Sequence, residues 1–131
     1  MRTDPVMDLE VALEGDGRVW LHAYKKDFAV DVKFGRATHT EVSLSPNAKT
    51  VNQLADMFEG FKSAPKSPLE QRLDGATIRV ELTPRVTNQK TATLFVIRPA
   101  STFGYPCESA HLTRLIAGLR QIAVFAAKYP L

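Results

Sequence analysis

The segment 105–112, which reads YPCESAHL, brings together the residue types of a thiol nucleophile and its base. It holds the only cysteine of the chain, Cys107, four residues before His111. A thiol close to a helix N-terminus can have a lowered pKa, and an adjacent histidine can act as its base. These two residues are therefore the first candidates for covalent catalysis in this sequence.

The residues that follow favour a structural role for this segment. Leu112 begins an apolar stripe with helical spacing, so we expect a helix to start near Ser109 or Ala110, with the Ser109 hydroxyl as an N-cap acceptor. Cys107 would then precede the helix, and the geometry of a pair four residues apart on one helix face would not apply to it. No second motif supplies an oriented base and an oxyanion site. We predict that Cys107 and His111 are not catalytic and that the protein is not an enzyme.

No other pattern points to a cofactor or a metal ion. The glycines of Glu14–Gly17 connect two expected strands, whereas a phosphate-binding loop leads from a strand into a helix. The three histidines and the cysteine do not have the spacing of metal ligands. The sequence therefore predicts neither a cofactor site nor a metal site.

The composition is that of one globular domain. The chain has 131 residues, of which 44% are hydrophobic and 24% charged, so we expect a single α+β domain over residues 1–131. A formal charge of +3 and a pI near 9.2 permit an acidic partner without requiring one. The N-terminus has no apolar signal-peptide region, and no apolar run approaches the length of a membrane-spanning helix. With one cysteine, no intramolecular disulfide can form. We therefore expect a cytoplasmic protein that does not contact a membrane.

Alternation of apolar and polar residues predicts four strands in the first third of the chain. The expected strands cover residues 7–13, 19–24, 28–34 and 38–44. The segments between them are short and rich in turn residues, as at Lys25–Asp27. Strands joined by short turns form an antiparallel meander, and strict alternation indicates that one face of this meander is buried.

Two segments have the three-to-four-residue spacing of amphipathic helices. The first has apolar residues from Val51 to Phe61 and is expected to end near Lys62. Ser45-Pro46 is the helix-start signal, with Thr50 as the alternative start. In the second, the apolar stripe begins at Leu112 within a helix that is expected to start near Ser109 or Ala110 and to end at Pro130. The apolar residues that we expect to be nearly fully buried beneath these helices are Val51, Leu54, Phe58, Leu112, Leu115, Ile116 and Leu119.

Two more strands are expected between the helices. Residues 78–82 alternate, and residues 91–97 are apolar on both faces, which favours a central position in a sheet. Residues 84–90 connect these strands, and residues 98–108 have the glycine and proline content of a loop. The sequence thus predicts an α+β fold with one antiparallel six-stranded sheet, in the order four strands, helix, two strands, helix. Both helices are expected to pack on one face of that sheet.

The opposite face of the predicted sheet is the candidate binding surface. The expected alternation brings the only tryptophan, a tyrosine and two histidines to this face, together with charged side chains. The candidate residues are Trp20, His22, Tyr24, Asp31, Lys33, His39, Glu41 and Arg79. Aromatic residues surrounded by charges suit a protein interface, whereas an excess of acidic residues on this face disfavours nucleic acid. Cross-strand packing of aromatics on a partly covered sheet is the alternative that involves no partner.

The order of the elements resembles that of the WapI-type immunity proteins of bacterial polymorphic toxin systems and of related small uncharacterised bacterial families. The matching positions are the first-helix pattern Leu54–Phe58, the segment Glu70–Leu73, the last-helix pattern Leu112–Ile122 and the terminal Tyr129-Pro130. The resemblance covers residues 19–130. It implies a cytoplasmic protein that binds and neutralises a cognate toxin, and it assigns no catalytic residue.

The sequence therefore favours a non-catalytic protein-binding domain, with an immunity protein against a toxin domain as the specific form of this hypothesis. The alternatives are a basic nucleic-acid-associated domain, which only the pI favours, and a bacterial protein of another kind with no enzymatic role. An enzyme that uses Cys107 and His111 is the third alternative, and it lacks the partner groups that such chemistry needs.

Overall fold

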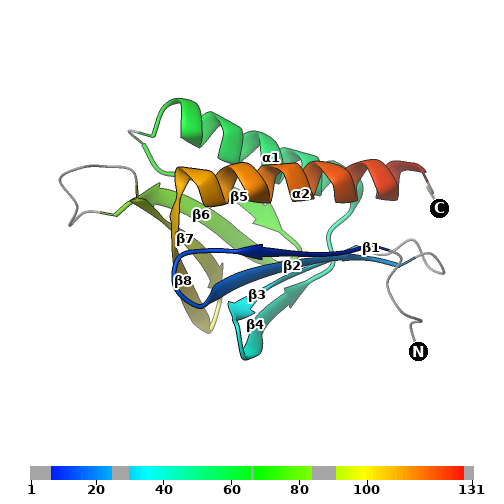
Figure 1. The fold of residues 1–131 in the computed structure, drawn as a ribbon, viewed down its shortest axis with the longest axis horizontal. Helices are drawn as coiled ribbons and strands as arrows, with labels where there is room; N and C mark the ends of the chain where they lie inside the picture. Colours follow the sequence, from blue (N-terminus) through cyan, green and yellow to red (C-terminus); the bar gives the residue numbers. More distant parts are fainter. Residues whose placement is uncertain (1–6, 25–29, 66, 84–90, 129–131) are drawn as a thin grey trace.

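The computed structural model describes residues 7–24, 30–65, 67–83 and 91–128. Three expectations from the sequence lie outside these residues, namely the turn at Lys25–Asp27, the connection 84–90 and the helix end at Pro130. In the described part of the chain, two four-stranded antiparallel sheets and two helices form an α+β fold. Figure 1 shows the two helices side by side along one side of the molecule, with the strands beneath them.

The first sheet is an antiparallel meander in the order β1-β2-β3-β4. Its strands are β1 (Met7–Ala12), β2 (Gly17–Ala23), β3 (Val30–Arg36) and β4 (His39–Leu44). Buried and partly exposed residues alternate strictly along β2, where Val19 and Leu21 are buried and Trp20 is partly exposed. The four strands expected from the alternation of the sequence, and their single buried face, are thus confirmed.

The second sheet follows α1 (Ala48–Ser63) and has the order β5-β6-β7-β8. Its strands are β5 (Leu69–Leu73), β6 (Ala76–Leu82), β7 (Thr91–Arg98) and β8 (Ser101–Glu108), and α2 (Ser109–Lys128) ends the described chain. The prediction of one six-stranded sheet is therefore wrong. The fold has two separate sheets, because β5 and β8 complete a second meander around the two strands that were expected.

Both strands that the sequence prediction missed are edge strands with unusual local sequences. β5 enters β6 through Asp74 and Gly75, whose φ angles are 49° and 82°. Two consecutive positive φ angles are typical of the type I′ hairpin turn, for which Asp-Gly is a strong signal. β8 contains Gly104 and Pro106, which suggested a loop. A proline is tolerated there because β8 pairs with β7 alone among the described strands, so that the missing N–H is not needed on its free side.

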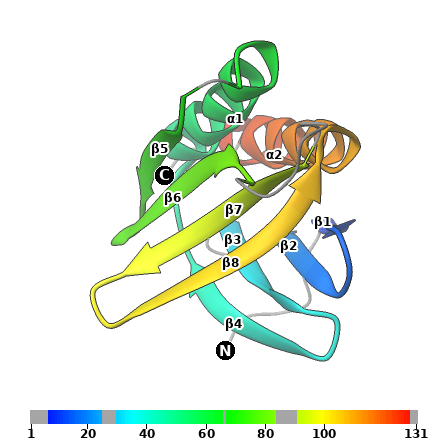
Figure 2. The ribbon, with the colours of Figure 1, turned by 90° about the vertical axis from the view of Figure 1, so that its left-hand side faces the viewer.

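Each helix packs on the sheet from the other half of the chain. α1 follows the first sheet and lies against β5 and β6, whereas α2 follows the second sheet and lies against β1 and β2. Figure 2 shows the two sheets spreading apart below the paired helices. The prediction that both helices cover one face of a single sheet is therefore wrong, although both helices do lie on the buried sides of the sheets.

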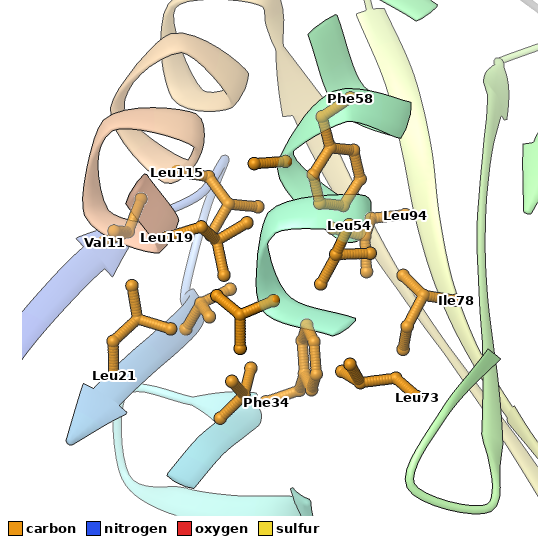
Figure 3. Packing of buried hydrophobic residues seen from close by; sticks show 14 of the residues in the cluster. Val11, Leu21, Phe34, Leu54, Phe58, Leu73, Ile78, Leu94, Leu115 and Leu119 are labelled. Carbon is orange, nitrogen blue, oxygen red and sulfur yellow. The ribbon is translucent and has the colours of Figure 1, made fainter. Parts of the chain in front are cut away.

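One hydrophobic core joins both sheets and both helices (Figure 3). The residues expected to be buried beneath the helices are at most 8% exposed, which confirms that prediction. Gly118 of α2 allows close approach to the first sheet, since a Cβ atom there would lie 2.8 Å from Leu21 Cδ1. The sheets also meet directly, because the rings of Phe34 in β3 and Tyr105 in β8 stack with centroids 6.4 Å apart.

The N-terminal end of α1 differs from the expected one. Asn47 is the N-cap residue, and its Oδ1 accepts a hydrogen bond from the Thr50 backbone N–H at 2.9 Å. The signal at Ser45-Pro46 lies just before this cap. Ser45 has another role, since its backbone N–H donates to Asp74 Oδ2 at 2.7 Å and so connects the end of the first sheet to the β5–β6 turn.

Candidate functional site

The outer face of the first sheet is the side that neither helix covers. We define it by the side chains that alternate with the core residues of β1 to β4, namely Asp8, Glu10, Arg18, Trp20, His22, Lys33 and Ser43. The strand register places Glu10, Trp20 and Lys33 side by side in one row across β1, β2 and β3. The next row contains Asp8, His22 and Asp31. Antiparallel pairing therefore assembles these residues from three strands on one surface.

Trp20 is held in place on this face by its neighbour in β1. Its indole Nε1–H donates to Glu10 Oε1 at 2.8 Å, and the other carboxylate oxygen of Glu10 lies 3.8 Å from Arg18 Nε. The ring is partly exposed, so it is available for contact without having to leave this position. Arg18 was not among the candidates from the sequence, although its place two residues before Trp20 in an alternating strand puts it on the same face.

His22 lies next to Trp20 and is fixed by a carboxylate. Its Nε2 lies 3.0 Å from Asp8 Oδ1, and its side chain is 17% exposed. The buried Nδ1 has no hydrogen-bond partner within the described residues. The Tyr24 ring meets the His22 ring edge-on, with centroids 6.3 Å apart. This histidine is therefore a preoriented but mostly covered part of the outer face.

Two of the candidate residues are buried. Tyr24 is 8% exposed and Asp31 is 5% exposed. One Asp31 carboxylate oxygen, Oδ1, accepts a hydrogen bond from the Ser45 hydroxyl at 2.9 Å. Neither residue offers its side chain to a docking partner, so the accessible part of the candidate surface is centred on Trp20.

Glu41 was expected on the outer face, but it points elsewhere because of a β-bulge. The register between β3 and β4 shifts at Phe34/Gly35, which makes Glu41 the extra residue. Its Oε1 accepts a hydrogen bond from the Tyr105 hydroxyl at 2.7 Å and lies 3.5 Å from Arg36 Nε. Burial and the bond to this carboxylate raise the pKa of Tyr105 above its usual value. Glu41 therefore connects the first sheet to β8.

His39 and Arg79 lie apart from Trp20. His39 is exposed at the start of β4, and its Nε2 lies 3.7 Å from Glu41 Oε2. Arg79 belongs to β6 of the second sheet, where its guanidinium group lies 3.6 Å from a Glu70 oxygen and 3.3 Å from a Glu81 oxygen. Because the predicted single sheet is two sheets, the eight candidate residues do not form one surface.

The cysteine and histidine of the 105–112 segment have structural roles. Cys107 is 0% exposed, and burial, followed by the nearby Glu14 carboxylate, raises the pKa of its thiol to about 12. The Nδ1 atom of His111 accepts a hydrogen bond from the Glu108 backbone N–H at 2.9 Å, which satisfies a free donor at the start of α2. In this arrangement the thiol is buried, and the His111 Nδ1 atom bonds to the backbone at the start of α2.

The described residues contain no group of three or more histidine, cysteine, aspartate or glutamate side chains arranged to hold a metal ion. In the same residues, neither helix combines the length and the apolar character needed to cross a membrane. Comparison of the chain with models of protein families, with curated proteins and with solved structures returned no match.

Proposed function

We propose that this protein is a non-catalytic protein-binding domain whose partner docks on the outer face of the first sheet, around Trp20. The observation that carries the proposal is the partly exposed indole held at 2.8 Å by Glu10 on a sheet face that neither helix covers. An aromatic side chain that is already fixed loses little conformational freedom on binding. Tryptophan is also among the residue types that most often dominate interface energies.

The charges around Trp20 suit the rim of such an interface. Asp8 and Glu10 are 64% and 59% exposed in their side chains, and Arg18 and Lys33 add positive charge on the same face. Charges of both signs at a rim select the orientation and the identity of a partner more than they add affinity. Two exposed carboxylates beside the indole also oppose a phosphate backbone, so a protein partner is favoured over nucleic acid.

The specific form of this proposal is an immunity protein that neutralises a cognate toxin domain in the cytoplasm. It is supported by the resemblance to WapI-type immunity proteins in the order of the elements and in the Leu112–Ile122 pattern. A toxin domain encoded next to this chain is the first partner to test. Co-expression with that domain should restore growth if the proposal is correct, whereas growth arrest despite a stably expressed chain would argue against neutralisation.

The decisive experiment is the substitution Trp20→Ala, measured against the partner that a pull-down from the source cell returns. We expect the substitution to weaken binding by about 2 kcal/mol or more, roughly thirtyfold in Kd. Trp20 is the only tryptophan of the chain, so indole fluorescence reports binding to the wild-type protein directly. Isothermal calorimetry measures the variant.

Phe95→Ala is the matched control for Trp20→Ala. Phe95 is a partly exposed aromatic residue in β7, and it lies over Gly104 of the second sheet. Its removal should leave the affinity within about twofold, since it lies outside the proposed interface. An unchanged affinity of the folded Trp20→Ala variant would refute the proposed docking surface. If the pull-down returns nucleic acid in place of a protein, the protein-binding proposal is wrong.

A further inference from the structure

A groove runs along the free edge of β1, with α2 as its second wall. Its central part has a volume of about 440 Å³ and is lined by Leu9, Glu10, Val11, Ala12, Arg114, Ala117, Gly118 and Gln121. A hollow of about 400 Å³ continues it at the other end of β1, between Met7 and Val124, and Gln121 lines both parts. The floor is apolar, and Val124 is 65% exposed at its end.

The β1 wall of the groove is an unpaired strand edge. Among the described strands, β1 pairs with β2 alone, in unbroken register from Met7↔Ala23 to Ala12↔Arg18. Half of the backbone N–H and C=O groups of an edge strand point away from its partner. The groove borders this free edge, since four consecutive residues of β1, Leu9 to Ala12, line it. An extended chain that enters the groove can therefore pair with β1 as a fifth strand of the first sheet.

In the other half of the molecule, two side chains bridge the equivalent space between helix and edge strand. There α1 lies beside the edge strand β5, and the side-chain amides of Gln53 and Gln71 meet at 3.5 Å across the gap. In α2, small residues face the corresponding space, since Ala117 is exposed in the groove and Gly118 has no side chain. The two halves share an order of elements, and the groove described here lies on the β1–α2 side.

Charge decides what kind of chain fits. Asp8 and Glu10 alternate with the groove-facing Leu9 along β1 and are exposed on the outer face. A second copy that paired through its own β1 in antiparallel register would place acid opposite acid, which is destabilising. Arg114 lies on the helix wall and makes no ion pair within the described residues, so basic side chains are also unfavourable on the groove side.

We propose that this groove binds an extended segment of a partner protein in which apolar and basic residues alternate. The apolar side chains enter the groove against Leu9, Val11 and Ala117, and the lysines or arginines lie on the outer face opposite Asp8 and Glu10. The backbone of the segment hydrogen-bonds to the free edge of β1. This site lies beside the Trp20 surface and shares Asp8 and Glu10 with its rim, but it does not use the indole ring.

The test uses synthetic peptides of the length of β1, which has six residues. The probe is fluorescein-labelled Lys-Val-Lys-Val-Lys-Val, and its charge-reversed counterpart is Glu-Val-Glu-Val-Glu-Val. At low ionic strength, fluorescence anisotropy should show the lysine peptide binding about tenfold more tightly than the glutamate peptide. The double variant Asp8→Lys with Glu10→Lys should reverse this preference. Equal affinities, or no binding of the lysine peptide up to about 1 mM, would refute the proposal.

Two further variants test the place of binding. Ala117→Tyr fills the groove from an exposed helix position and should weaken binding of the lysine peptide by about tenfold or more. Ala110→Tyr places the same side chain at an exposed position of α2 that does not line the groove, and it should leave binding unchanged. Full binding by a folded Ala117→Tyr protein would exclude the groove.

Two measurements distinguish this proposal from docking at the Trp20 surface and from dimerisation through the groove. Trp20→Ala should leave peptide binding within about twofold, so loss of the Trp20 surface and loss of the groove can be told apart. Light scattering should find a monomer in the absence of peptide. A dimer that Ala117→Tyr dissociates would show that the groove takes a second copy of this chain instead.

Discussion

Replacing Cys107 by alanine should change how the stability of the protein depends on alkaline pH. The thiol is completely buried, and its pKa is raised from 9.0 to about 12. When the pKa of a group is higher in the folded state than in the unfolded state, its contribution to the free energy of unfolding is greatest at pH values below the unfolded-state pKa. Its contribution is therefore complete below pH 9 and is lost as the pH rises from 9 toward 12, because the unfolded chain ionises first.

The size of this effect follows from the shift in pKa. Each pH unit above 9 should remove roughly 1 kcal/mol from the free energy of unfolding of the wild-type protein. Cys107→Ala removes one buried sulfur atom, which should cost roughly 1 kcal/mol at neutral pH. The variant should thus be less stable than the wild type at about pH 8, equal to it near pH 10, and more stable above that pH.

Urea denaturation under reducing conditions, followed by circular dichroism, measures both proteins across this range. Tyr105 also has a raised pKa, but both proteins contain it, so its contribution cancels in the difference. A difference between the two proteins that stays constant with pH would mean that the folded and unfolded thiols titrate alike. If the wild type instead became more stable relative to the variant as the pH rises, the folded protein would stabilise the Cys107 thiolate. That result would support the nucleophile hypothesis.

Three other substitutions test the packing of the helices. Ile116→Ala should lower the free energy of unfolding by roughly 2–5 kcal/mol, because Ile116 is 8% exposed in the core; a loss below about 1 kcal/mol by urea denaturation would contradict this burial. Gly60→Ala should raise the free energy of unfolding by about 0.5–1 kcal/mol, seen as a higher midpoint of thermal unfolding. The new Cβ has room, because its nearest neighbour would be Leu69 Cδ1 at 3.7 Å, an ordinary contact. Gly118→Ala makes the same helix-favouring change, but its Cβ would lie 2.8 Å from a buried leucine, so it should be neutral or destabilising. A gain in stability equal to that of Gly60→Ala would show that α2 does not pack tightly against the first sheet at Gly118.

The helices and the first meander could be predicted because their signals are local. The stripe from Leu112 to Ile122 has a helical period, and the burial of its residues follows from that period. The strand β5 was also predictable in principle, since Asp74-Gly75 between alternating residues is a hairpin signal. β8 was not, because its glycine and proline argue against a strand unless its position at a sheet edge is known.

The candidate surface was predicted only in part, for a related reason. Alternation correctly placed Trp20 and His22 on the face away from the core. It placed Glu41 there as well, and the bulge at Phe34/Gly35 moved that side chain toward Tyr105. It also assigned Arg79 to the same sheet, although Arg79 lies in the second one. A single extra residue in a strand reverses which face its side chain occupies, and nothing in the local pattern marks it.

By itself, the amino-acid sequence determined which residues of the two helices enter the core and which segments of the first sheet alternate, since apolar periodicity depends only on neighbours along the chain. The tertiary structure decided how those segments pair. It divided the strands between two sheets, placed each helix on the sheet of the other half and used His111 as a capping acceptor. It also left β1, among the described strands, with a partner on one side only, beside α2. These features depend on contacts between residues far apart in sequence, such as Tyr105 with Glu41 and Ser45 with Asp74, and a pattern of neighbouring residues carries no information about them.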